Sequence, residues 1–158
     1  MRTIRQLHAL VGSELIENAG NLRQKQAMAS GTGMVYAPAA VIEKRLEELV
    51  SWFNSTFSSC QGSLADTLIL VAVFFSEFLF IHPFSNGNGR VARLLVNHLL
   101  RHHTNVPFSL FTDVNGRTTY LKVLEEAQLH NSMSGLLTYF LWSLRRVVAN
   151  AVYLALED

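Results

Sequence analysis

Residues 82–93 of this 158-residue chain read HPFSNGNGRVAR and join two segments whose apolar residues have helical spacing. Gly87 and Gly89 let the backbone take positive φ angles and come close to a ligand. A helix that opens directly after such a turn points the unpaired N–H groups of its first turn outward, where they attract anions together with the helix dipole. We therefore predict a helix start near Asn88 with an anion site in front of it.

Three side chains of this stretch have the chemistry of phosphoryl or nucleotidyl transfer. Arg90 and Arg93 are three residues apart and are expected on one face of the first turn, where guanidinium groups bind phosphate oxygens in a two-point fork. His82, with an ordinary pKa of about 6.5, can accept a proton near neutral pH and act as a general base. The alternatives are a structural histidine before a proline and an ordinary Asn-Gly turn. A phosphate chain beside His82 is the ligand that the combination favours.

The apolar run upstream, residues 68–81, is interrupted by Glu77. A membrane-spanning helix needs about 20 apolar residues, so we predict a buried central helix and no membrane span. Ser63 followed by Asp66 resembles a capping box at its start. Its end is expected near His82, because a proline disfavours helical geometry in the residue before it.

The same 3.6-residue spacing predicts five further helices. Their inward residues are expected to be Ile4, Leu7 and Val11; Ile42, Leu46, Leu49, Val50 and Phe53; Val91, Leu94, Leu95 and Leu99; Tyr120, Val123, Leu124 and Ala127; and Leu137, Phe140, Leu141, Leu144 and Val148. Residues 12–33 are polar and glycine-rich and are predicted to form a long loop. Met34-Val35-Tyr36 is the only segment with a strand pattern. The prediction is an all-α fold with one small β element.

Composition limits the classes of partner. Charged residues make up 16% of the chain and apolar residues 49%, against about 25% charged in an average soluble domain. Such sparse charge indicates either extensive burial or a surface that meets a partner, and a homodimer is one form of it. The net charge of +1 argues against a nucleic-acid binder, which needs a basic stripe.

Length and termini predict one domain, residues 1–158. The N-terminus has no secretory apolar region and opens directly into a helical pattern, as expected of a domain excised from a longer protein. The single cysteine, Cys60, excludes an internal disulfide framework and is compatible with a reducing compartment. We expect a cytoplasmic location, with a secreted effector domain as the alternative.

The stretch from His82 to Arg93 resembles the signature of the Fic family, H-x-F-x-[D/E]-G-N-G-R-x-x-R, at every fixed position except one. The order of the flanking segments resembles the family over nearly the whole chain. The resemblance implies a Fic-like helical bundle with a small β-hairpin flap. It also implies the activity of the Fic/Doc protein adenylyltransferases, which transfer AMP from ATP to Ser, Thr or Tyr hydroxyls of target proteins.

The resemblance further implies a role for each matching position. His82 would take the proton of the target hydroxyl. The phosphates of ATP would be held by Gly87, Asn88, Gly89, Arg90 and, at the γ-phosphate, Arg93. The flap at Met34, Val35 and Tyr36 would hold an extended target segment by strand addition. Tyr120 and Gln128 would border the adenine, although Tyr120 is equally well read as a core residue.

Asn86 is the one departure from the signature, because the family has Asp or Glu there to hold Mg²⁺. Mg²⁺ favours carboxylate oxygens and offsets charge in phosphoryl transfer. An asparagine keeps a carbonyl oxygen but no negative charge, so affinity for Mg²⁺ should fall, while the phosphates of the nucleotide can still recruit the metal. Three interpretations follow: a slower adenylyltransferase, an enzyme with another phosphate-containing donor, or a nucleotide-binding pseudoenzyme.

Overall fold

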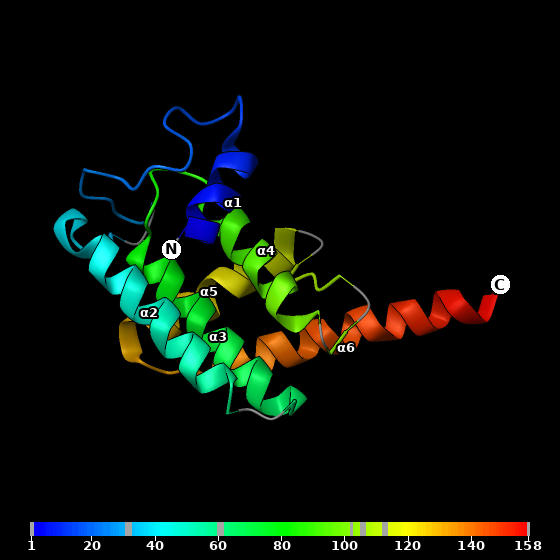
Figure 1. Ribbon diagram of the computed structural model, residues 1–158. Coiled ribbons are helices and arrows are strands. Elements are labelled where there is room, and N and C mark those ends of the chain that lie inside the picture. Colours follow the sequence, from blue (N-terminus) through cyan, green and yellow to red (C-terminus); the bar gives the residue numbers. More distant parts are fainter. Residues whose placement is uncertain are drawn as a thin grey trace.

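The computed structural model describes residues 2–30, 33–59, 62–101, 103–104, 107–111 and 114–157. Within these ranges the chain is helical, as Figure 1 shows, and the all-α prediction is confirmed. The elements in chain order are α1 (Arg2–Gly12), the 3-10 turn η1 (Ala39–Val41), α2 (Ile42–Phe57), α3 (Leu64–Ile81), α4 (Asn88–Leu100), α5 (Val114–His130) and α6 (Ser134–Glu157). Cys60 lies outside the described residues.

Helix α3 is the centre of the bundle and contacts α2, α4, α5 and α6. Aromatic rings tie it to the C-terminal helices: Phe75 lies 5.9 Å from the ring of Tyr120 and 5.5 Å from that of Phe140. By length and composition alone, α3 is apolar enough to cross a membrane, with a mean hydropathy of 2.2. However, 61% of it is buried inside the bundle, which is also what the core helix of a globular domain shows.

Both ends of α3 follow the local sequence. At the start, the Ser63 hydroxyl accepts a hydrogen bond from the Asp66 N–H at 3.2 Å, as the capping pattern predicts. At the end, His82 takes the left-handed conformation that closes many helices. The turn that follows leads directly into α4 at Asn88, the helix start predicted from Gly87.

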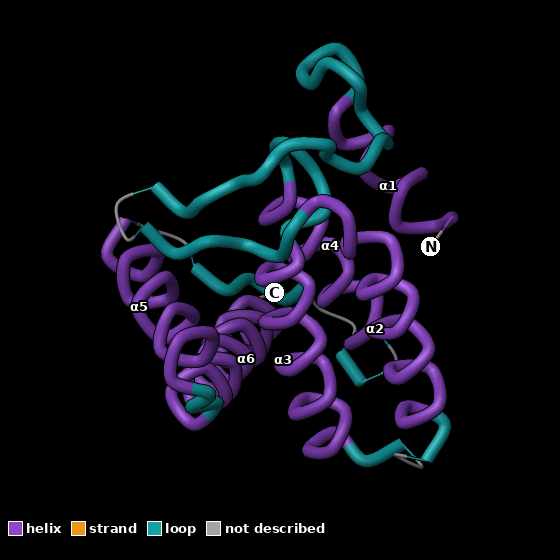
Figure 2. Tube along the Cα trace, turned by 90° about the vertical axis from the view of Figure 1, so that its left-hand side faces the viewer, coloured by secondary structure: helices purple, strands orange, loops and turns teal. Residues whose placement is uncertain are grey.

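The segment predicted as a strand forms only an isolated antiparallel bridge between Met28 and Val35. Figure 2 shows the two arms of this flap (residues 26–30 and 33–37) running side by side as loops. The ladder stops because its groups bond elsewhere: the Tyr36 carbonyl accepts from the Gln26 side chain, and the Ala37 N–H donates to the Phe80 carbonyl. The predicted β element is therefore a single bridge within the described residues.

Helix α6 corrects part of the predicted core. Phe140 and Leu144 are buried as expected, but Leu141 is 56% and Val148 43% exposed. In Figure 1 the C-terminal half of α6, which carries Val148, reaches past the other helices. On α4, Leu94 is likewise 46% exposed. Apolar periodicity marks a helix, but the neighbours decide which apolar residues are covered.

Candidate active site

His82 stands where α3 ends, with φ 50° and ψ 59°. Its N–H still donates to the Phe78 carbonyl at 3.0 Å, so the helix closes on this residue. The left-handed region costs a residue with a β-carbon about 1–2 kcal/mol. Such backbone strain is found preferentially at functional sites.

The protonation state of His82 follows from its neighbours. Its Nδ1 lies 3.2 Å from the Leu79 carbonyl oxygen, which only accepts, so Nδ1 carries the proton and Nε2 keeps a lone pair. Burial lowers the pKa of His82 to about 4; the Leu79 carbonyl opposes the shift, and the Arg23 charge adds to it. The ring stacks on Tyr36 of the flap, with centroids 3.8 Å apart. At neutral pH the imidazole is uncharged and can accept a proton at Nε2.

The loop after His82 is held closed by Asn88. Its side-chain oxygen accepts from the Phe84 N–H at 3.0 Å, and its side-chain nitrogen donates to the Phe84 carbonyl at 2.7 Å. The Asn88 side chain is buried by this two-point bond. The phosphate contact expected of Asn88 is thus left to its backbone N–H.

Gly87 forms the turn into α4 with φ 79° and ψ −3°. A β-carbon there would lie 3.0 Å from Ile16 Cδ1 and 3.3 Å from His8 Nε2, so both conformation and space require glycine. The Gly87 carbonyl accepts from the Val91 N–H at 3.1 Å and opens the helix. No side-chain cap bond closes the first turn of α4. The N–H groups of a helix's first turn have no intrahelical partners, and they are the donors that an anion site would use.

His8 of α1 holds this turn through a hydrogen bond to its backbone. Its Nδ1 accepts from the Gly20 N–H at 2.7 Å, so Nε2 carries the proton and donates to the Asn86 carbonyl at 3.0 Å. Burial lowers the pKa of His8, the bond to Asn86 opposes this, and the Arg90 charge adds to it. A lone histidine on an amphipathic helix has no sequence signal for such a role, and sequence reasoning missed it.

Asn86 is exposed, and its side-chain oxygen accepts from the Gly87 N–H at 2.7 Å. The donor set is therefore one amide oxygen that is already engaged. No cluster of three or more His, Cys, Asp or Glu side chains stands close enough to hold a metal in the described part of the chain. These residues do not form a Mg²⁺ site by themselves, since Mg²⁺ is typically held by one or two carboxylates plus substrate phosphates.

A cavity of about 190 Å³ opens at His82 and gathers residues from the flap, α3, α4 and α5. The predicted site residues among its lining are Tyr36, His82, Gly89, Arg93, Tyr120 and Gln128. The other predicted residues, Met34, Val35, Asn86, Gly87, Asn88 and Arg90, do not line it. The two arginines of the motif therefore differ: Arg93 faces the cavity, while Arg90 lies outside its lining.

Two aromatic or charged residues in the cavity lining were not expected from the sequence. Arg117 of α5 brings a second cation to the cavity beside Arg93. Phe111 lies under the Arg93 guanidinium, 5.3 Å from its ring centroid. Arg117 precedes Tyr120 by three residues, a spacing that places both on one helix face and would have identified it. Phe111 lies in a loop, where no periodicity points to it.

Tyr120 and Gln128 both reach the cavity from α5. Tyr120 is also a core residue, 4% exposed, and burial raises the pKa of its hydroxyl. The Gln128 side chain donates to the Ser76 carbonyl at 3.0 Å and is thereby oriented against α3. The two interpretations of Tyr120, core residue and site residue, are thus compatible.

Two curated proteins are similar to this chain over most of its length. The chain is 31% identical over 129 residues to a protein named ribonucleoside-diphosphate reductase small chain from Ostreid herpesvirus 1, a match that covers 76% of this chain and 21% of that protein. It is 32% identical over 111 residues to protein adenylyltransferase fic-1 of Caenorhabditis briggsae, covering 70% of this chain and 20% of that protein. The chain thus spans about a fifth of the length of these relatives.

A solved structure has the same fold. A Fic family protein from Desulfovibrio desulfuricans superimposes with a TM-score of 0.80 at 25% identity, over 98% of this chain and 47% of that one. The family model described as Fic/DOC family matches residues 1–100, which include α1, the flap, α3 and the whole turn into α4. The chain belongs to the Fic/DOC family.

Proposed function

We propose that this chain is a protein adenylyltransferase domain with His82 as its general base. The observation that carries the proposal is the arrangement at the end of α3. A neutral imidazole with its acceptor nitrogen at Nε2 shares a cavity with Arg93 and Gly89, at the start of a helix whose first turn no side chain caps. Relatives named protein adenylyltransferases support the same reaction class.

The proposed transfer uses ATP as donor and a Ser, Thr or Tyr hydroxyl of a target protein as acceptor. Nε2 of His82 takes the hydroxyl proton as the oxygen attacks the α-phosphorus. The bond between the α-phosphorus and its bridging oxygen breaks, and pyrophosphate leaves. Arg93 and the N–H groups of the first turn of α4 bind the phosphate oxygens, which would otherwise repel the incoming oxygen.

The size of the cavity suggests that it holds the adenine of the nucleotide, with the phosphates outside it along the turn before α4. At about 190 Å³ it is smaller than the ~300–1,000 Å³ of typical ligand pockets. It therefore takes one part of the nucleotide, and we place the adenine between Tyr120 and Gln128. The phosphates then lie along the turn at Gly87 and Gly89. The exposed flap residue Val35, 54% exposed, is the proposed docking edge for the target segment.

Asn86 supports a second candidate function, a nucleotide-binding pseudoenzyme or a transferase with another phosphate-containing donor. No carboxylate stands at the position where the family signature has one, and the amide oxygen of Asn86 is bonded to Gly87. The main proposal therefore uses no step through Mg²⁺. Any Mg²⁺ would arrive with the phosphates of the nucleotide.

Labelled ATP separates these functions. Incubation with ATP labelled at the α-phosphate is expected to label protein, whereas ATP labelled at the γ-phosphate is not. His82→Ala should abolish labelling, because a general base contributes about 10²–10⁴-fold, while ATP binding persists. His98→Ala, on the exposed face of α4, is the matched control and should label normally. Nucleotide binding without any labelling would select the pseudoenzyme.

A further inference from the structure

Arg23 is a buried cation in the loop between α1 and the flap. It is 5% exposed, and no Asp, Glu or Lys is buried with it in the part of the chain that the structure describes. The two ion pairs that the described residues form, Lys44–Glu48 and Arg45–Glu77, do not involve it. Burying a charge is costly unless it is fully hydrogen-bonded. The cost of burying the Arg23 charge must therefore be offset by hydrogen bonds to uncharged groups.

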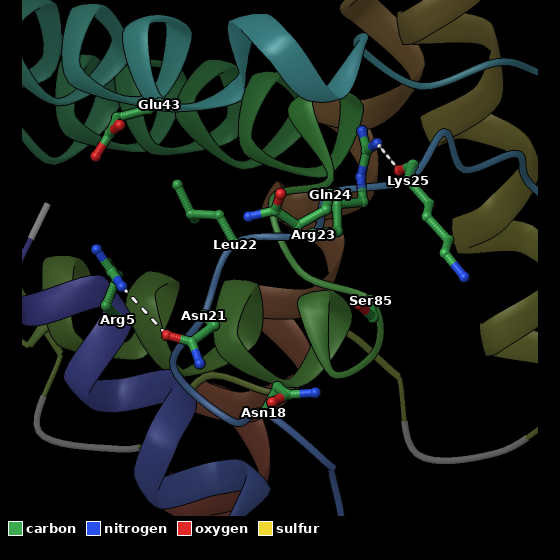
Figure 3. A pocket seen from close by; sticks show the side chains of 9 residues that line it. All are labelled: Arg5, Asn18, Asn21, Leu22, Arg23, Gln24, Lys25, Glu43 and Ser85. Carbon is green, nitrogen blue, oxygen red and sulfur yellow. Dashed lines mark hydrogen bonds between the residues drawn. The ribbon is translucent and has the colours of Figure 1, made fainter.

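The compensation comes from four backbone carbonyl oxygens. Nε donates to His82 at 2.7 Å, and Nη1 donates to Lys25 at 2.7 Å, the bond drawn in Figure 3. Nη2 donates both to Ala37 and, at 3.2 Å, to Ile81. The backbone N–H of Arg23 adds a bond to the Pro83 carbonyl at 2.9 Å.

These carbonyls belong to the two ends of the flap and to the end of α3, the segments that bring Tyr36 and His82 to the cavity. Lys25 directly precedes the flap, and Ala37 is its last residue. Ile81 is the last residue of α3 and His82 caps it. Carbonyls at this end of a helix lack intrahelical partners, and the helix dipole favours a cation there. One planar side chain thus joins the residue before the flap and the last residue of the flap to the backbone of the base.

We propose that Arg23 is a positioning residue that holds the flap and His82 in one fixed relation, so that the Tyr36 ring stays stacked on the imidazole. The assignment of His82 as the base rests on the function proposed above. Arg23 touches only the backbone of that residue and no reacting atom. It acts through the two segments whose side chains line the cavity.

The chemistry of the site requires arginine rather than lysine. A guanidinium carries five donors in a rigid plane, and four of them are used on carbonyls from three segments of the chain: Lys25, Ala37 and the pair Ile81 and His82. An ammonium has three donors at one point and cannot span these segments. Arg23→Lys keeps the charge while breaking the fork, and it is therefore the variant that isolates positioning from electrostatics.

The first measurement is amide hydrogen exchange in Arg23→Lys. The flap amides of Ala29 and Tyr36, which donate to the Met34 and Ala27 carbonyls, are expected to exchange about tenfold faster or more, while the cores of α3 and α4 remain protected. Arg5→Lys is the matched control, because Arg5 also donates hydrogen bonds to this loop, but to Gly20 and Asn21 and not to the flap or His82. Faster exchange throughout the fold would mean a purely structural role and would overturn the proposal.

The second measurement is the titration of His82 by NMR. The charged or titratable groups that face this imidazole are the cations Arg23, Arg93 of α4 and Arg117 of α5, and the neutral phenols of Tyr36 in the flap and Tyr120 in α5. In Arg23→Lys the charge stays, so a rise of the His82 pKa from about 4 towards 6.5 reports the loss of the covering flap. An unchanged titration, together with unchanged exchange, would also overturn the proposal.

Kinetics supply the third readout. Misplacing catalytic groups by about an ångström can cost about 10²-fold in rate, so kcat of Arg23→Lys should fall by about 10–100-fold with little change in KM for ATP. A rise in KM for ATP with unchanged kcat would contradict the positioning role.

If the wild-type chain transfers no AMP, the proposed function fails, but amide exchange and the His82 titration still decide the role of Arg23. Arg23→Ala is a more severe variant, and Arg23→Lys decides the outcome if the alanine variant does not fold.

Discussion

The rings of His8 and Phe84 lie parallel, with centroids 3.7 Å apart and 2° between their planes. Phe84 is fully buried, and His8 is 1% exposed. The stack joins α1 to the loop that carries the phosphate-binding motif, and the bond from His8 to the Asn86 carbonyl joins them a second time. The geometry of the motif therefore depends on a helix that lies 70 residues or more before it in the chain.

Stability is expected to fall as the pH drops below about 6.5. His8 and His82 both have pKa values lowered from 6.5, that of His82 to about 4. A lowered histidine pKa means that the unfolded chain binds more protons between the two values, so stability is fully present above about 6.5 and is lost towards pH 4. Thermal melting at several pH values measures this. His8→Phe should flatten the curve over that range, whereas His98→Phe, at an exposed histidine, should leave it steep.

Gly87→Ala should weaken both fold and nucleotide binding. The added β-carbon needs a left-handed backbone, at a cost of about 1–2 kcal/mol, and meets Ile16 and His8. The turn would then shift relative to the start of α4. Chemical denaturation and calorimetry with ATP check the two effects. Gly62→Ala is the control, because Gly62 also has a positive φ but an added β-carbon would meet no atoms within 4 Å. This variant should lose fold stability but keep its affinity for ATP.

Arg93→Ala should weaken ATP binding more than Arg90→Ala. Arg93 lines the cavity over the Phe111 ring, and Arg90 does not line it. Removing a charge-assisted hydrogen bond costs about 1.5–3 kcal/mol, or one to two decades in affinity. Calorimetric titration with ATP compares the two variants. Equal affinity in Arg93→Ala and the wild type would place the phosphate site elsewhere.

Asn86→Asp is expected to raise Mg²⁺-dependent AMP transfer by lowering the Mg²⁺ requirement. The carboxylate keeps the bond to the Gly87 N–H, adds the ligand that Mg²⁺ prefers, and stands at a helix start that favours negative charge. The melting temperature should change little. Rates measured against Mg²⁺ concentration test this, and a leftward shift identifies the natural chain as a tuned-down enzyme. Activity with a different donor, present only with Asn86, would indicate a change of substrate.

The sequence alone determined the elements that depend on neighbours along the chain. The capping of α3 by Ser63, its end at His82 and the turn at Gly87 follow from local chemistry over a few residues, and the structure confirms them. The same local reasoning placed His82, Gly89 and Arg93 near one another, because they lie within 12 residues. The structure brings these three to one cavity.

Tertiary structure decided everything that depends on partners distant in sequence. Arg23 is one ordinary arginine in a polar loop until its carbonyl partners, up to 59 residues away, are brought around it. The flap forms one bridge rather than a strand pair because its outer groups bond to Gln26 and Phe80 instead. Helical periodicity could not separate Arg93 from Arg90, nor Leu144 from Leu141, because a period describes a face and only the packed neighbours determine what that face meets.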